Sequence, residues 1–180
     1  MQEKIYLSDM DSWNPSEDAP SVPVKVIDID NATGGIFNFY CTGCGDCCRG
    51  GGNVYFSQEE MENVKEFLNL SEEKWSLMKD RLVQFKKNGL YVHSSSKACI
   101  FIDKENLCRI YPVRPLQCRS YPYWPTVFEN KKELLRHRKT CPGFHQNTAP
   151  VTSLQIVRRV NATVKIFNEQ QSHPEDPVIL

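Results

Sequence analysis

The segment CTGCGDCC, residues 41–48, places four cysteines within eight positions, and the last two of them are adjacent. Its core is the spacing Cys41-x-x-Cys44-x-x-Cys47. Two successive two-residue spacers fold a loop in which three sulfur atoms can converge on one object. A soft metal is the simplest object that would need three thiolates.

Length and composition set the frame for this segment. The chain has 180 residues, enough for one ordinary domain. Lysine plus arginine and aspartate plus glutamate number 22 each. This balance gives no reason to expect nucleic acid, an anionic membrane surface or a strongly acidic substrate as partner. We expect instead an unidentified protein or redox partner.

The cellular compartment decides how eight cysteines are used. Residues 1–20 contain acids, a tryptophan and prolines where a secretory signal needs a basic start and an apolar run. No stretch approaches the ~20 apolar residues of a membrane-spanning helix. We therefore expect a cytoplasmic protein. In a reducing compartment, cysteines bind metal or react more often than they form disulfides.

The kind of metal centre follows from ligand spacing. Zinc sites usually take two ligands from each of two separated turns, whereas bacterial ferredoxins combine a C-x-x-C-x-x-C run with a remote cysteine followed by proline. Cys141-Pro142 matches that remote position. The spacing therefore favours an iron–sulfur cluster of the 4Fe–4S type, with zinc as the alternative.

The other cysteines extend the ligand set. In an extended backbone, neighbouring side chains point to opposite sides, so Cys47 and Cys48 are expected to face different targets. One or two centres would then use all eight thiols. The predicted metal ligands are Cys41, Cys44, Cys47, Cys48, Cys99, Cys108, Cys118 and Cys141.

Charges near these ligands are consistent with an anionic centre. Between Cys99 and Cys141, nine basic residues stand against four acidic ones. Arg109 and Arg119 each follow a cysteine directly, so we predict that they bind the cofactor's sulfur and stabilise its charge. His145 and Asp46 are weaker ligand candidates, since an aspartate in such a loop more often caps it.

The rest of the sequence predicts an α+β fold: a small metal-stabilised single domain with several helices, short hairpins and irregular cysteine-rich loops. Residues 1–23 form a polar leader, 24–170 the domain and 171–180 a tail. We expect two strands around a turn between 24 and 40, a hairpin over 98–111, and helices from Ser57, from Ser71 to Gly89, at 116–119, at 133–139 and at 153–169.

Four blocks carry a resemblance to a known family. They are Cys41-x-x-Cys44-Gly45-x-Cys47-Cys48-Arg49, then Cys99-Ile100-Phe101, then Cys108-Arg109-Ile110-Tyr111-x-x-Arg114-Pro115-x-x-Cys118-Arg119-x-Tyr121-Pro122, then Cys141-Pro142-Gly143. Over 41–143 the chain resembles the YkgJ-type cysteine-cluster family, described as a zinc- or iron-chelating domain. Its members are often labelled iron–sulfur oxidoreductases by analogy, and flagellin lysine methylases carry a similar motif. The resemblance implies a metal centre but specifies no reaction.

Three functions remain open at this point. The first is an iron–sulfur protein in electron transfer, redox or group-transfer chemistry. The second is a non-catalytic zinc module in which thiolates hold an irregular fold together. The third is thiol exchange through the Cys-x-x-Cys pairs. No nucleotide-binding glycine motif, serine–histidine–acid order or nucleophile elbow is visible, so an enzymatic role is not specified.

Overall fold

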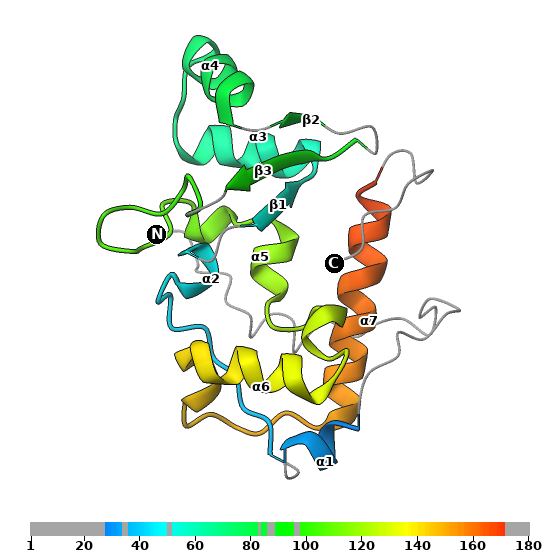
Figure 1. The fold of residues 1–180 in the computed structure, drawn as a ribbon. Coiled ribbons are helices and arrows are strands. Elements are labelled where there is room, and N and C mark those ends of the chain that lie inside the picture. Colours follow the sequence, from blue (N-terminus) through cyan, green and yellow to red (C-terminus); the bar gives the residue numbers. More distant parts are fainter. Residues whose placement is uncertain are drawn as a thin grey trace.

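The computed structural model describes residues 28–33, 36–49, 52–82, 84–85, 89–95 and 98–171, and the predicted leader lies outside them. Within this part of the chain, helices combine with an antiparallel sheet, which confirms the α+β class (Figure 1). No helix in these ranges has the length and apolar character needed to cross a bilayer. The helices are α1 (Ile29–Thr33), α2 (Asp46–Arg49), α3 (Gln58–Phe67), α4 (Glu72–Leu82), α5 (Leu116–Ser120), α6 (Lys131–Thr140) and α7 (Ser153–Glu169).

The sheet has the order β1-β3-β2, with β1 at Gly52–Phe56, β2 at Gln84–Phe85 and β3 at Tyr91–Ser95. Both pairings are antiparallel. The helix predicted from Ser71 to Gly89 is therefore too long, because α4 ends at Leu82 and the next described residues pair with β3. Strand pairing overrides an apolar helical period that continues as far as Phe85.

α3 begins where the sequence predicts. The Ser57 hydroxyl accepts from the Glu60 N–H (3.2 Å), and the Glu60 carboxylate accepts from the Ser57 N–H (2.9 Å), which completes a capping box. The helix buries Met61 and Val64 completely. They belong to the Phe56 cluster, whose buried members are Phe56, Met61, Val64, Trp75, Phe101 and Ile110.

Glu60 also ties distant helices together. Its Oε1 accepts from the N–H of Leu116 at the start of α5 (2.6 Å) and from Nε2 of Gln170 after α7 (3.1 Å). The residue is only 6% exposed. A buried carboxylate is tolerated because several donors surround it, and these donors fix α5 against α3 and α7.

A second core lies beside α6 and α7. This Phe37 cluster has the buried members Ile29, Phe37, Tyr121, Tyr123, Val127, Phe128, Leu134, Phe144, Ile156 and Val160. Figure 1 shows α6 crossing near one end of the longer α7, with α5 between α6 and the sheet. The helices predicted at 116–119, 133–139 and 153–169 are confirmed as α5, α6 and α7.

The two strands predicted between 24 and 40 are wrong where the structure describes them. Ile29–Thr33 forms α1, and residues 36–40 join no strand. Asp28 explains the helix, since its carboxylate accepts from the N–H of Asn31 (3.1 Å) as a cap does. Ile29 then packs into the Phe37 cluster.

The hairpin predicted over 98–111 is present in reduced form. One bridge joins Ile102 to Cys108, and the Arg109 N–H donates to the carbonyl of Phe101 (2.8 Å). At the turn, the Asp103 carboxylate accepts from the N–H groups of Glu105 and Leu107 (3.0 and 2.8 Å). The arms are therefore held by a turn rather than by a long ladder.

Candidate metal centre

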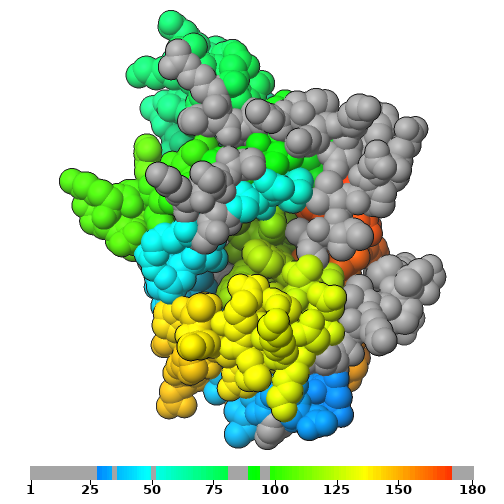
Figure 2. Space-filling view, in the orientation of Figure 1, coloured from blue at the N-terminus to red at the C-terminus, as the bar shows by residue number. Residues whose placement is uncertain are grey.

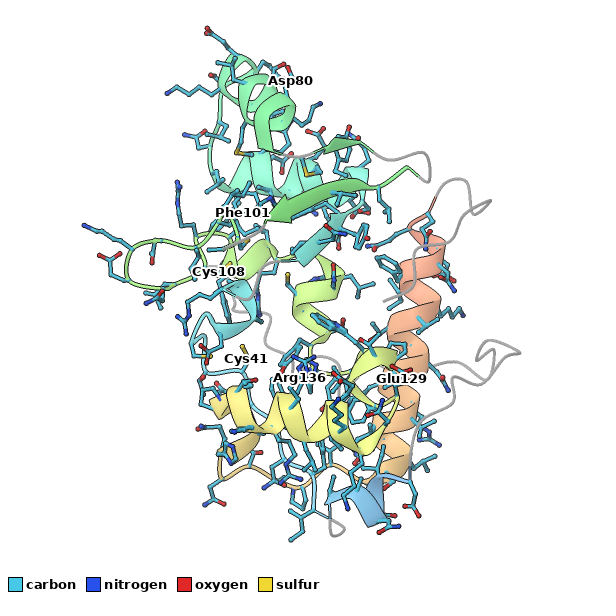
Figure 3. All side chains as sticks on the ribbon, viewed as in Figure 1. Cys41, Asp80, Phe101, Cys108, Glu129 and Arg136 are labelled. Atoms are coloured by element: carbon cyan, nitrogen blue, oxygen red, sulfur yellow. The ribbon has the colours of Figure 1, made fainter. Side chains whose placement is uncertain are left out.

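All eight cysteines line one cavity of about 670 Å³. They come from the loop and short helix at 41–49, both arms of the 98–111 hairpin, α5 and the end of α6. Figure 2 shows the surface hollowed between the cyan atoms near α2 and the yellow atoms of α6, and Figure 3 labels Cys41 and Cys108 at this region. All eight thiols are free of disulfides. Hereafter this is the cysteine cavity.

The first wall is the 41–49 segment. Gly43 and Gly45 adopt φ values of +69° and +74°, which L side chains rarely adopt, and so curl the loop. Sγ of Cys47 and Sγ of Cys48 lie 3.9 Å apart. The two side chains therefore do not point to opposite sides as they would in extended backbone, because both lie on helix α2, and their assignment to different centres stays a prediction.

The hairpin packs directly on this wall. The Cys99 N–H donates to the carbonyl of Cys48 (2.7 Å), and the two side chains are hydrogen-bonded as well. A Cβ on Gly45 would lie 2.3 Å from the carbonyl oxygen of Asn106. Only glycine therefore allows the loop to approach the hairpin turn so closely. Cys99 and Cys108, one on each arm of the hairpin, both line the cysteine cavity.

The last wall joins Cys141 to the first. The Tyr40 N–H donates to the Gly143 carbonyl (3.0 Å), which brings the chain entering Cys41 beside the chain leaving Cys141. A Cβ on Gly143 would meet the Tyr40 carbonyl oxygen at 2.7 Å. Cys141 packs against the Phe37 cluster, whereas Cys99 and Cys108 pack against the Phe56 cluster. The cysteine cavity thus lies between the two cores.

Three of the cysteine sulfurs interact with the backbone N–H group two residues further along the chain. The pKa of Cys99 is lowered, first by its hydrogen bond with Cys48 and also by the backbone N–H two residues further along, and the N–H at the same offset favours the thiolate of Cys108 and of Cys141 against a larger effect of burial. The donors are the N–H groups of Phe101, Ile110 and Gly143. Such donors stabilise the thiolate that a metal requires.

Burial and the neighbouring thiols raise the pKa values of several of these cysteines. Burial raises the pKa of Cys108, of Cys141 and, most strongly, of Cys118. Cys47 donates to Cys48 and so favours its thiolate, but the hydrogen bond to Cys99 and burial raise the pKa of Cys48 to about 12. Thiols with raised pKa values are poor nucleophiles, and Cys99, whose pKa is lowered, differs from these cysteines in that respect.

The arginines beside the sulfurs differ from those expected. Arg109 and Arg119 do not line the cavity, and the Arg119 guanidinium pairs with Glu60 (3.3 Å). Arg114 does line the cavity: it stacks 3.6 Å from the centre of the Tyr111 ring and donates to Sγ of Cys41 (3.8 Å), whereas binding of a cofactor by Arg109 or Arg119 stays a prediction. The block Tyr111-x-x-Arg114-Pro115 was the sequence signal for it.

His145 and Asp46, the two weaker ligand candidates, differ in whether they line the cysteine cavity. The ring Nε2 of His145 lies 2.8 Å from the carbonyl of Arg138, and His145 does not line the cysteine cavity. Asp46 does line it, with a carboxylate that accepts from the Cys44 thiol (3.4 Å) and pairs with Arg49. Asp46 therefore caps the loop, as expected for an aspartate in such a turn.

The arrangement fits a thiolate-bound metal in its donor chemistry. Eight sulfur donors surround one space, and thiolates select zinc, Cu(I) and iron–sulfur clusters. Within the part of the chain that the structure describes, no three side chains from cysteine, histidine, aspartate and glutamate are close enough to hold one metal ion. The division of the eight cysteines among ligand positions therefore stays a prediction.

Comparison with known proteins identifies the region. The model of the family CxxCxxCC, described as "Putative zinc- or iron-chelating domain", matches residues 40–142. This match supports metal binding and names zinc and iron without choosing between them. No solved structure matches the chain. Since the family model covers more than half of the sequence, the chain belongs to the CxxCxxCC family.

Proposed function

We propose that the chain binds an iron–sulfur centre of the 4Fe–4S type through its cysteines and serves in electron transfer or a related redox reaction. The observation that carries the proposal is the cysteine cavity itself: eight thiols from separate segments line one space. The spacing Cys41-x-x-Cys44-x-x-Cys47 with the remote Cys141-Pro142 favours a 4Fe–4S cluster over zinc as the occupant of this space. When bound, such a centre accepts and releases single electrons.

The chain's own residues would hold and shield this centre. The 41–49 loop would supply Cys41, Cys44 and Cys47, and Cys141, followed by proline, would supply the remote ligand. Arg114 and the backbone amides that point at sulfur would offset the charge of the thiolates. Aromatic side chains such as Tyr111, which also line the cavity, would limit the access of water.

A structural zinc module is the second candidate, because the family description names zinc beside iron. Two zinc ions with four thiolates each would also use all eight cysteines. In that case the metal would hold the two cores together and transfer no electrons. The two candidates differ in colour, in sulfide content and in redox behaviour.

The deciding experiment is purification without oxygen, followed by iron, zinc and acid-labile sulfide analysis and a visible absorption spectrum. We expect iron and sulfide in stoichiometric amounts and a broad charge-transfer band that bleaches on reduction. A colourless protein with stoichiometric zinc and no sulfide would replace the proposal with the zinc module. A protein without bound metal would overturn both.

A further inference from the structure

A chain of hydrogen bonds runs from the surface of α6 toward Cys141. Nε of Arg136 donates to Glu133 (2.8 Å), and Nη2 of Arg136 lies 3.0 Å from Nε2 of His137. Nδ1 of His137 lies 3.1 Å from the hydroxyl of Tyr121. Tyr121 and Cys141 both line the cysteine cavity, and the Tyr121 side chain acts to lower the pKa of the Cys141 thiol, as a donor beside a thiolate does. Figure 3 shows the Arg136 side chain lying between α6 and the region of Cys41.

The donor and acceptor in each of these hydrogen bonds follow from which nitrogen and oxygen atoms carry protons. A guanidinium has only N–H donors, so Nε2 of His137 must accept from Arg136. A neutral imidazole that accepts at Nε2 carries its proton at Nδ1 and donates there to the Tyr121 oxygen. The Tyr121 O–H is then left to donate to Cys141. Every bond therefore points toward the sulfur.

The surroundings support this assignment. Burial lowers the pKa of His137, and the charge of Arg136 acts in the same direction, so the neutral ring is favoured. The Tyr121 ring is held in place by aromatic contacts with Phe39 and Trp124, whose ring centres lie 5.6 and 5.1 Å away. These ring contacts fix where the Tyr121 hydroxyl oxygen lies.

We propose that Tyr121, oriented by His137 and Arg136, is a positioning residue for the metal centre: its hydroxyl donates to Sγ of Cys141 and sets the electron density on that ligand. The inference rests on the proposed metal centre. A donor to a ligand sulfur stabilises the more negative, reduced state of a cluster, and it holds the thiolate ready for any thiophilic metal. Its loss should therefore lower a reduction potential and weaken metal binding.

The test compares Tyr121→Phe with Tyr123→Phe in the loaded, full-length protein. Tyr121→Phe keeps the ring contacts and removes only the donor. Tyr123 belongs to the same Phe37 cluster and also has a bonded hydroxyl, which accepts from Arg159 (2.6 Å), but it does not line the cysteine cavity. The control therefore removes a hydroxyl from the same core without touching a sulfur.

Two quantities are measured. Chelator competition should show metal bound about tenfold more weakly in Tyr121→Phe, the lower end of the usual effect of losing such a partner. If the metal is an iron–sulfur cluster, the one-electron reduction equilibrium should shift about tenfold, a potential about 59 mV lower. Tyr123→Phe should match the unmodified protein in both. Equal values for the two variants would overturn the inference.

A double-mutant cycle tests the part played by His137. His137→Leu should reproduce part of the Tyr121→Phe effect, and His137→Asn should restore some of it, because an amide N–H can donate from near the Nδ1 position. In the Tyr121→Phe background, His137→Leu should cause no further change. An undiminished effect there would mean that His137 acts through packing alone and would contradict the donor chain.

Metal analysis of the unmodified protein keeps this inference separate from the proposed function. Zinc in place of iron would remove the iron–sulfur proposal, and the chelator competition would still decide the role of Tyr121. A protein that binds neither metal would overturn both.

Discussion

The Phe37 cluster gathers fully buried side chains from α6 and α7 into one core, with Leu134 and Ile156 both at 0% exposure. The walls of the cysteine cavity are instead turns, a four-residue helix and a single β-bridge, and their thiols are partly exposed. The first region gains its stability from apolar burial. The second has few such contacts to gather eight sulfur atoms, so a bound metal would contribute much of its stability.

A bound metal would matter most between the two cores. The cysteine cavity lies between the Phe37 and Phe56 clusters, and thiols pack against each. A metal bound there would join two cores that each bury their own side chains. We therefore expect substitutions of the cysteines to remove the metal, and substitutions in the Phe37 cluster to lower the stability of the fold.

The largest effect is expected from removing a ligand. Cys44→Ser should lose the metal, since a serine oxygen is a poor substitute for a thiolate toward a soft metal. Amide hydrogen exchange over 98–111 should then rise strongly, while amides in α7 stay protected. Unchanged metal content and an unchanged thermal melt in Cys44→Ser would contradict the account of the cysteine cavity.

A substitution in the Phe37 cluster should lower the stability of the fold without loss of metal. Leu134→Ala removes a fully buried side chain on α6 and should cost about 2–5 kcal/mol in the free energy of unfolding. The metal per folded chain should stay the same. Leu135→Ala on the same helix, where the side chain is 46% exposed, should cost less than about 0.5 kcal/mol in chemical denaturation. Similar losses in the two variants would refute the assigned burial.

The contact between the 41–49 loop and the hairpin can be tested with two glycines. Gly45→Ala and Gly43→Ala introduce the same side chain at nearly equal positive φ, but only at Gly45 does the new Cβ meet a backbone carbonyl, at 2.3 Å. Gly45→Ala should therefore be less stable than Gly43→Ala by about 1–3 kcal/mol, and it should bind metal more weakly. Equal melting temperatures and metal affinities would show that the close approach is not needed.

The smallest effect compares two arginines. Arg114→Lys removes the stacked guanidinium that donates to Cys41 and should weaken metal binding about tenfold in chelator competition. Arg109→Lys should leave the affinity unchanged, because Arg109 does not line the cavity. A larger effect at Arg109 would restore the role that its place beside Cys108 suggests.

Sequence patterns predicted the elements that carry their own local signals. The capping box at Ser57 and the apolar period of residues 153–169 both led to the helices that form. They failed where tertiary contacts decide the outcome: Phe85 continues a helical stripe but pairs with β3, and Ile29 forms a helix because Asp28 caps it. Local propensity carries no information about a partner strand.

In the candidate site, too, the sequence predicted what local spacing decides and missed what tertiary contacts decide. The spacing of the cysteines was enough to predict that they would gather, and all eight line one cavity. The direction of Arg119 was not predictable, because the buried carboxylate that attracts it lies 59 residues away in the sequence. The role of Tyr121 was equally hidden, since it depends on His137 and on the packing of α6 against the aromatic core.

The central claim is that sulfur atoms of this chain bind the metal directly. X-ray absorption at the edge of the metal found by elemental analysis, on protein purified without oxygen, tests it most directly. We expect a first shell of sulfur alone, at about 2.3 Å if the metal is zinc. A first shell dominated by nitrogen or oxygen would contradict it.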